Sequence, residues 1–299
     1  METLELYDDP LAFGEAASTF LATQALRCTV IASQLAVLLA AEVVTSRNFP
    51  TPYWFALARS GDGAVIGLAM RTADYPPYLI DMPPQAAGEL AAQVMARGER
   101  PRGANGTPSA AAAFCERLVD AWGGRVETEI ASRLFQLTQL RVPDQVPGSG
   151  RLATPVDLDL LAAWLDAFSD EVHIGGPHNE LSPQDRHAEN LRFVADKVAG
   201  ANQWVWTDRQ GQIVSMAGAR DPAFGFARVG PVYTPPAARN QGYAAAVTAL
   251  ATRAVLERGA IPCLFTDLAN PTSNGVYQRI GYEPVDDTVH LRIADTPAA

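Results

Sequence analysis

Two adjacent prolines, Pro235 and Pro236, determine where one strand of this chain has to end. The residues before them, 226–234, have the composition of a strand, but a proline lacks the N–H group that sheet pairing requires. Beyond a short polar turn, apolar residues recur at helical spacing, and Gly259 stands where a glycine often ends a helix. The periodic residues are Val247, Leu250, Ala251, Ala254 and Val255. The segment therefore predicts a strand, a turn and a helix in direct succession.

The turn predicts an anion-binding site at the start of that helix. The first N–H groups of a helix have no acceptor within it, and the helix dipole adds partial positive charge there. Gly242 has no Cβ to keep an anion from the backbone, and Ala244 keeps the first turn narrow. Arg239 adds a cation that can bind phosphate, the alternative being that it is a solvated surface charge. A pyrophosphate group fits these donors.

A segment rich in proline and glycine, residues 140–157, shows neither helical nor strand periodicity. We interpret this segment as a linker between two domains. The expected domains are residues 1–145 and residues 151–299.

The two halves show similar landmarks in the same order. Helical sequence at 9–44 precedes a predicted hairpin at 53–70, and helical sequence at 157–199, interrupted at 175–177, precedes a second hairpin at 203–219. An internal duplication explains this order, and chance is the alternative because the identities are few. Both interpretations give the second half the same architecture.

Composition excludes several classes of protein. The 299 residues are 48% apolar, enough for a substantial core, and the net charge of -10 disfavours binding to nucleic acid or anionic membranes. Residues 1–10 lack the features of a signal peptide, and the apolar stretch 29–44 is too short and too polar to cross a bilayer, so we expect a cytoplasmic protein. The three cysteines are expected to be buried and reduced, without a metal site. They are Cys28, Cys115 and Cys263.

Two linked motifs in the second half resemble those of the GNAT superfamily of N-acetyltransferases. Residues 232–244, VYTPPAARNQGYA, are similar to motif A, whose core reads Gln/Arg-x-x-Gly-x-Gly/Ala. After a predicted buried strand at 261–267, residues 270–277 resemble the family's Asn-x-x-Ala/Ser-x-x-x-Tyr helix, and Tyr282 begins the next strand. The resemblance is specific over 203–293, and the preceding helices extend it to residue 153.

This resemblance implies an α/β (α+β) protein of tandem GNAT folds, each with a mixed, mostly antiparallel central sheet flanked by helices. It implies acetyl-CoA as cosubstrate, with pantetheine entering where the strand ending at Thr234 parts from strand 261–267. Tyr277 is the implied catalytic acid, which protonates the departing CoA thiolate. The residues implied to bind CoA are Val232, Tyr233, Thr234, Arg239, Asn240, Gln241, Gly242, Tyr243, Ala244, Asn270 and Ser273.

Two of these residues also have purely structural interpretations. Tyr277 could be a core aromatic whose hydroxyl finds a carbonyl, although its place after Asn270 favours the acid role. Asn270 followed by Pro271 is a natural helix N-cap, with or without a contact to CoA.

The acceptor side of the site is expected in the acidic loop between the two helices of the second half. In GNAT folds this loop borders the acceptor pocket, and here it carries Glu171, His173 and Glu180, which could hold a cationic amine or could simply be solvated. The family often has a carboxylate on the strand before motif A, but this strand has Arg228 and no acid. The general base is therefore unassigned, with Glu180 or a chain of waters as hypotheses.

The first half resembles the family faintly. Residues 85–90 stand where motif A is expected, but Leu90 replaces the small residue and Glu89 lies where phosphate would come. We expect a degenerate copy without activity.

The sequence thus predicts an enzyme that transfers acetyl from acetyl-CoA to the primary amine of a small molecule by direct attack. A longer acyl chain, or a peptide or lysine acceptor, is the alternative within this class. A module that binds acyl-CoA without catalysis, as a sensor, is the alternative outside it.

Overall fold

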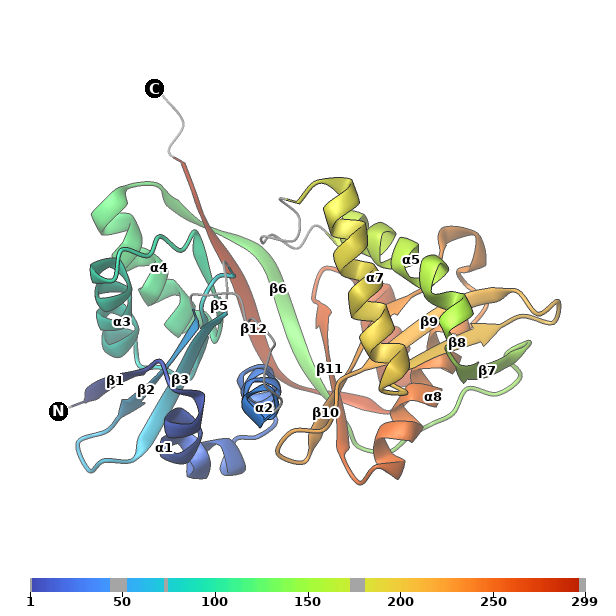
Figure 1. The fold of residues 1–299 in the computed structure, drawn as a ribbon, viewed down its shortest axis with the longest axis horizontal. Helices are drawn as coiled ribbons and strands as arrows, with labels where there is room; N and C mark the ends of the chain where they lie inside the picture. Colours follow the sequence, from blue (N-terminus) through green and yellow to red (C-terminus); the bar gives the residue numbers. More distant parts are fainter. Residues whose placement is uncertain (1, 44–52, 73–74, 173–180, 296–299) are drawn as a thin grey trace. The chain divides into compact units, whose positions relative to one another are not determined.

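The structure is a computed structural model that describes residues 2–43, 53–72, 75–172 and 181–295 (Figure 1). Contacts within the chain divide it into two compact units. The N-terminal unit comprises residues 1–133 and 286–299, and the C-terminal unit comprises residues 134–285.

These units differ from the two ranges expected from the sequence. The boundaries fall inside two long strands, β6 (Arg125–Leu137) and β12 (Tyr282–Ala294), rather than in the segment predicted as a linker. That segment is partly sheet, because Ser149–Leu152 forms β7 and pairs with β8 (Gln203–Thr207). Its four residues are too few to show a strand period among the surrounding prolines and glycines.

The N-terminal unit contains a sheet in the order β1-β2-β3-β4-β5-β12-β6. The pairs β1–β2, β2–β3, β3–β4 and β5–β12 are antiparallel, and the pair β4–β5 is parallel. Strand β1 was not predicted from the sequence. The remaining elements are β1 (Thr3–Tyr7), α1 (Pro10–Thr23), α2 (Thr29–Val43), β2 (Tyr53–Arg59), β3 (Val65–Thr72), β4 (Tyr78–Ile80), α3 (Pro84–Ala96), β5 (Gly103–Gly106) and α4 (Pro108–Trp122).

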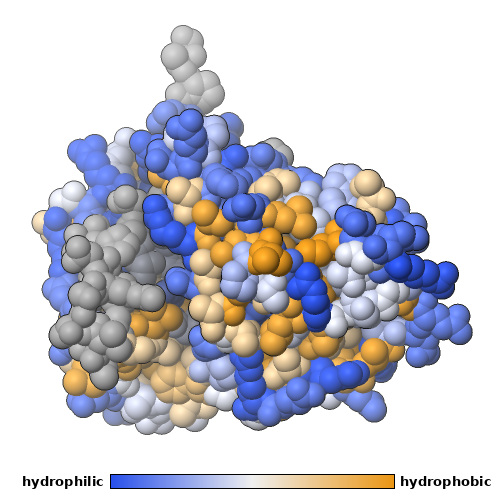
Figure 2. Space-filling view, turned by 45° about the vertical axis from the view of Figure 1, so that its right-hand side comes forward, coloured by the Kyte–Doolittle hydropathy of each residue, from blue (hydrophilic) through white to orange (hydrophobic). Residues whose placement is uncertain are grey.

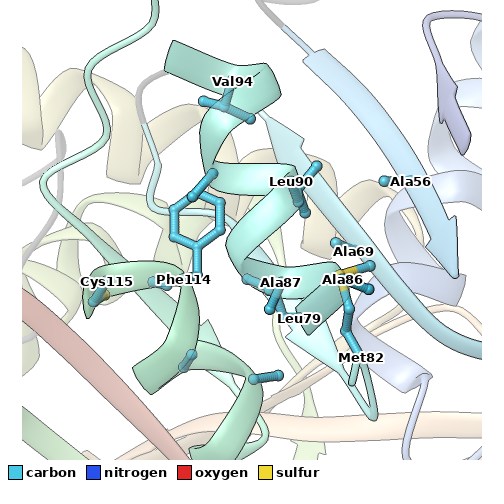
Figure 3. Packing of buried hydrophobic residues seen from close by; sticks show 14 of the residues in the cluster. Ala56, Ala69, Leu79, Met82, Ala86, Ala87, Leu90, Val94, Phe114 and Cys115 are labelled. Atoms are coloured by element: carbon cyan, nitrogen blue, oxygen red, sulfur yellow. The ribbon is translucent and has the colours of Figure 1, made fainter. Parts of the chain in front are cut away.

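Both faces of this sheet are covered, as strand β2 shows. Alternate residues of a strand point to opposite faces. Trp54 packs in a cluster with residues of α3 and α4, whereas Phe55 stacks on Phe13 of α1 with ring centroids 4.5 Å apart. Figure 3 shows the α3 and α4 side of this core, with Phe114 of α4 beside Leu90 of α3. The continuous apolar run in β2 follows from burial on both sides.

The C-terminal unit has the sheet order β12-β6-β11-β10-β9-β8-β7, with its part of β12 and β6 at one edge. Strands β10 and β11 pair in parallel, and β7, β8, β9 and β10 pair antiparallel in succession. The predicted mixed, mostly antiparallel sheet is confirmed. The remaining elements are α5 (Leu158–Val172), α7 (Pro183–Ala199), β9 (Ile213–Ala219), β10 (Phe226–Tyr233), α8 (Tyr243–Glu257), β11 (Ile261–Asp267) and α9 (Pro271–Arg279), with 3-10 turns at Pro155–Asp157 and Pro236–Ala238.

Helices cover both faces of this second sheet too. Trp204 of β8 packs in a cluster with Val247 and Ala251 of α8. Its neighbour Val205 packs with Leu161 of α5 and Val194 of α7 on the opposite face. The end of β10 therefore lies between a face covered by α8 and a face covered by α5 and α7.

The three cysteines are buried and free, as predicted. None of the helices in the described part of the chain is long and apolar enough to cross a membrane. Figure 2 shows a largely hydrophilic surface on which apolar residues gather near the centre of the view.

Candidate functional site

Strands β10 and β11 pair only over their first residues and then part. The parallel pairing joins Phe226–Arg228 to Ile261–Cys263, and no later residue of β10 pairs with β11. Peptide groups of a strand point alternately to its two neighbours, so the remaining length of β10 presents unpaired N–H and C=O groups on the β11 side. The pairing of β10 with β11 therefore ends before Thr234, where the two strands were predicted to part.

A bulge in β10 directs Tyr233 to the face covered by α5. The register with β9 shifts between Val229 and Val232, and both of these valines lie in the cluster on the α8 face. Because one extra residue reverses the alternation of the strand, Tyr233 packs on the opposite face. Its ring lies beside those of Trp164 and Phe168, with centroids 5.9 Å and 6.5 Å away.

Nine residues, 234–242, connect β10 to α8. Asn240 and Gly242 both adopt positive φ, of 63° and 83°. Gly242 is the N-cap of α8, and a Cβ added there would lie 3.2 Å from a methyl carbon of Val146. A glycine is required at this position by its backbone conformation.

The start of α8 carries a row of unpaired donors. The first intrahelical bond runs from Ala246 N–H to the Gly242 carbonyl. The six preceding N–H groups, of residues 240–245, donate to none of the residues that the structure describes. Gly242 offers no capping side chain. These donors and the positive end of the helix dipole can bind an anion that reaches the end of the opening between β10 and β11.

Arg239, in the same connection, binds Glu171 near the end of α5. Its Nη2 donates to both carboxylate oxygens, at 2.8 Å and 2.7 Å, and its Nε donates to the Thr234 carbonyl at 2.9 Å. The hydroxyl of Tyr233 also donates to Glu171, at 3.1 Å. Burial and this carboxylate raise the pKa of Tyr233. The structure thus brings together one predicted acceptor residue, Glu171, and three predicted CoA-binding residues, Tyr233, Thr234 and Arg239.

Tyr277 lies on α9, partly buried against the core of the C-terminal unit. Its ring meets Tyr282 edge to face, with centroids 6.3 Å apart. Its hydroxyl makes no hydrogen bond to any described residue. Burial raises the pKa of this hydroxyl to about 12. Tyr277 therefore holds its proton at neutral pH.

Asn270 caps α9, as predicted. Its side-chain oxygen accepts from the Ser273 N–H at 3.0 Å, and Pro271 occupies the first turn. The Asn274 side chain donates to the Asn270 carbonyl at 2.9 Å. This cap fixes the start of the helix that carries Tyr277.

Two other predicted acceptor residues, His173 and Glu180, lie outside the described residues. Within the described ranges, no group of three or more His, Cys, Asp or Glu side chains could hold a metal ion. One polar cluster had no signal in the sequence: Asp166 of α5 bonds His187 and Asn190 of α7, at 2.6 Å and 2.8 Å.

The N-terminal unit has no comparable connection. Only three residues, 81–83, separate β4 from α3, and Pro84 at the start of α3 has no N–H to offer. The end of β4 is tied to β5 because the Thr107 hydroxyl accepts from the Asp81 N–H at 3.0 Å. Residues 85–90, which stand where motif A was expected, lie in the first two turns of α3, because the helix begins directly after Pro83.

Comparisons with known proteins agree with this geometry. Residues 209–291, which include β10, α8 and α9, match the model of the family described as FR47-like protein. The chain is similar in structure to a Drosophila protein at 13% identity, with a TM-score of 0.64, over 98% of this chain and 99% of that one. It is also similar to a GCN5-related N-acetyltransferase from Sphaerobacter thermophilus at 14% identity, with a TM-score of 0.57, over 99% and 98% of the two chains.

The fold is that of the GNAT acetyltransferases. A third similar structure is a tandem GNAT protein from the clavulanic acid biosynthesis pathway, at 14% identity with a TM-score of 0.53, over 99% of this chain and all of that one. No curated protein matches the chain by sequence. The GNAT resemblance of the C-terminal half is thus confirmed, and the predicted tandem of GNAT folds has a counterpart of the same extent.

Proposed function

We propose that the C-terminal unit is an N-acyltransferase that transfers acetyl from acetyl-CoA to the primary amine of a small molecule. The N-terminal unit is a GNAT-like domain without a cofactor site of its own. One observation carries this proposal: a row of six unpaired backbone donors lies where two parallel strands have just parted.

The donors suit the pyrophosphate of CoA. The N–H groups of residues 240–245 at the start of α8 have no acceptor among the described residues, and Gly242 leaves the backbone open to close approach. Neutral ligands gain little from a helix N-terminus, whereas anions gain from both the donors and the dipole. We assign Asn240, Gln241, Tyr243 and Ala244 to this contact through their backbones.

The opening beside β10 suits pantetheine, an extended chain with two amides. Such a chain can bond the exposed edge of a strand as an additional strand does. Val232, Tyr233 and Thr234 lie at the unpaired end of β10 and are the residues that would bond it. Ser273 and Asn270, at the start of α9, complete the proposed CoA site.

Tyr277 supplies the acid for the reaction. Attack by a neutral amine on the thioester carbon forms the C–N bond, and the C–S bond breaks as the carbonyl re-forms. The departing thiolate takes the hydroxyl proton of Tyr277, which is protonated at neutral pH. The amine proton passes to a base that we leave unassigned, and a backbone N–H at the β10 edge polarises the carbonyl.

Glu171 is the described residue that best fits recognition of the amine. It lies beside the end of β10, and a bound guanidinium shows that it pairs with a cation. His173 and Glu180 are proposed to contribute to the same acceptor site. The acidic balance of the chain, with a net charge of -10, favours a cationic acceptor.

An amine screen tests the proposal. The purified protein is mixed with acetyl-CoA and a panel of small primary amines, and free CoA thiol and acetylated amine are measured. The proposal expects amine-dependent thiol release with a matching acetyl-amide product. Binding of acetyl-CoA with no transfer to any amine, short peptide or lysine derivative would support a sensor instead.

A further inference from the structure

We propose that Arg239 and Glu171 form a latch that couples the two substrates, in which each substrate binds one half of the ion pair and releases the other half. This inference rests on the proposed function. CoA phosphate draws the Arg239 guanidinium away from Glu171 and so favours the acceptor amine there, and an amine on Glu171 releases Arg239 to phosphate. The Arg239–Glu171 latch thus favours the complex that holds both substrates.

In the closed pair, the charged groups of Arg239 and Glu171 are engaged with each other. The Nη2 of Arg239 donates to both oxygens of Glu171, at 2.8 Å and 2.7 Å, while its Nε is held by the Thr234 carbonyl. Tyr233 donates a third hydrogen bond to the same carboxylate. An ammonium group that pairs with Glu171 therefore competes with this guanidinium for the carboxylate oxygens.

Arg239 is also the one basic residue available to the anion site from the connection itself. It is the only lysine or arginine in residues 234–245. It lies three positions before the N-cap Gly242, next to the row of unpaired donors. One guanidinium therefore serves two anions, the carboxylate of Glu171 and the phosphate that the donors would hold.

The exposure of the pair suits an exchangeable contact. The side chains of Arg239 and Glu171 are 42% and 43% exposed, whereas those of the Arg71–Glu99 pair in the N-terminal unit are 8% and 11% exposed. Exposed ion pairs stabilise a protein weakly, so a phosphate can replace one at little cost. The Arg71–Glu99 pair, by contrast, has the burial of a fixed structural contact.

Two roles are conceivable for this ion pair, and they predict opposite effects of Glu171→Gln on the affinity for CoA. If the pair is a static brace that shapes the connection, Glu171→Gln loosens the connection and weakens CoA binding. If the pair is a latch, Glu171→Gln frees Arg239 and strengthens CoA binding, by about threefold to fivefold for an exposed pair. Because thermodynamic coupling is reciprocal, bound CoA should raise the affinity for the amine by the same factor by which the bound amine raises the affinity for CoA.

The test is a double-substitution cycle on the full chain, read by calorimetric titration with CoA. The proteins are the parent, Glu171→Gln, Arg239→Ala and the combined variant, each with a thermal unfolding curve to show that it is folded. Asp170→Asn is the matched control, because it removes one negative charge from the adjacent position, where Asp170 pairs with Arg186 at 3.0 Å.

The latch predicts tighter CoA binding by Glu171→Gln, weaker binding by Arg239→Ala, and no gain from Glu171→Gln once Arg239 is absent. Asp170→Asn is expected to stay within about twofold of the parent, since its charge is exposed and screened. A gain that persists without Arg239, or a loss of affinity in Glu171→Gln, would overturn the latch. A folded parent that binds no CoA would instead remove the proposed function on which the latch rests.

Discussion

Replacing Tyr277 with phenylalanine removes one oxygen atom and should separate catalysis from stability. The hydroxyl bonds no described residue, while the ring packs edge to face on Tyr282 at 6.3 Å and remains in the variant. The free energy of unfolding should therefore change by less than about 0.5 kcal/mol, because no hydrogen bond is lost. Turnover should fall by about 10²- to 10³-fold, the usual contribution of a positioned acid.

The adjacent tyrosine provides a matched control with the opposite expectation. Tyr282 is 1% exposed, and its hydroxyl lies 2.7 Å from that of the equally buried Thr252. Tyr282→Phe leaves the Thr252 hydroxyl without this partner and should cost about 1 to 2 kcal/mol of stability. Its turnover should stay near that of the parent at a temperature where both are folded.

The assay is thiol release from acetyl-CoA with the amine identified by the screen, together with urea unfolding of each variant. The acid role predicts that Tyr277→Phe lowers kcat and leaves acetyl-CoA affinity unchanged, since the hydroxyl acts when the C–S bond breaks. A Tyr277→Phe variant with at least a third of parental turnover would refute the assignment. So would equal losses of turnover in the two variants.

Three further substitutions test other parts of the structure. Gly242→Ala should weaken acetyl-CoA binding at least tenfold. Gly225→Ala is the control: Gly225 has the same φ of 83° and no atom within 4 Å of an added Cβ, so this variant should share the strain of about 1 to 2 kcal/mol but bind acetyl-CoA normally. Equal affinities of the two variants in calorimetry would contradict this. Asp157→Asn should lose about 2 kcal/mol of stability at pH 7, because the Arg151 guanidinium lowers the pKa of Asp157 to about 2. The parent should lose the same stability as the pH falls from about 4 to 2, and urea unfolding of both proteins across this pH range checks the prediction. Burial lowers the pKa of Lys197, the only lysine, to about 7, so above pH 7 the unfolded chain binds more protons than the folded chain. The stability of the parent should therefore rise from pH 7 to 10. Lys197→Met should lack that rise in the same urea titrations.

The succession of strands and helices in the C-terminal half could be predicted because particular residues mark where these elements end and begin. Pro235 and Pro236 end β10 because they have no N–H groups for sheet pairing, and the observed strand stops at Tyr233. The Asn270–Pro271 pair marks the start of α9, and the observed cap bond to Ser273 confirms it. Each of these signals involves only a few adjacent residues, so the local sequence is enough to predict the end of the strand and the start of the helix.

Contacts between distant residues could not be predicted in the same way. Glu171 and Arg239 are 68 positions apart, and their meeting depends on the bulge in β10 that turns Tyr233 toward α5. That bulge changes the face of every later residue in the strand, and nothing in a strand composition fixes where it occurs.

The N-terminal half illustrates a different limit. Residues 85–90 resemble motif A only faintly, and the structure places them in the helix α3, which begins at Pro84 because proline is favoured in the first turn of a helix. Only residues 81–83 connect β4 to α3, and a comparison with motif A at Glu89 and Leu90 could not reveal the length of this connection.

The most direct test of the central claim is the number of acetyl-CoA molecules that one chain binds. Calorimetric titration of the parent and of a folded Arg239→Ala, Gly242→Glu variant gives this number and locates the site. One molecule per chain in the parent and none in the variant is the predicted result. Binding of two molecules, undiminished binding by the variant, or no binding by the parent would contradict a single acyl-CoA site at the start of α8.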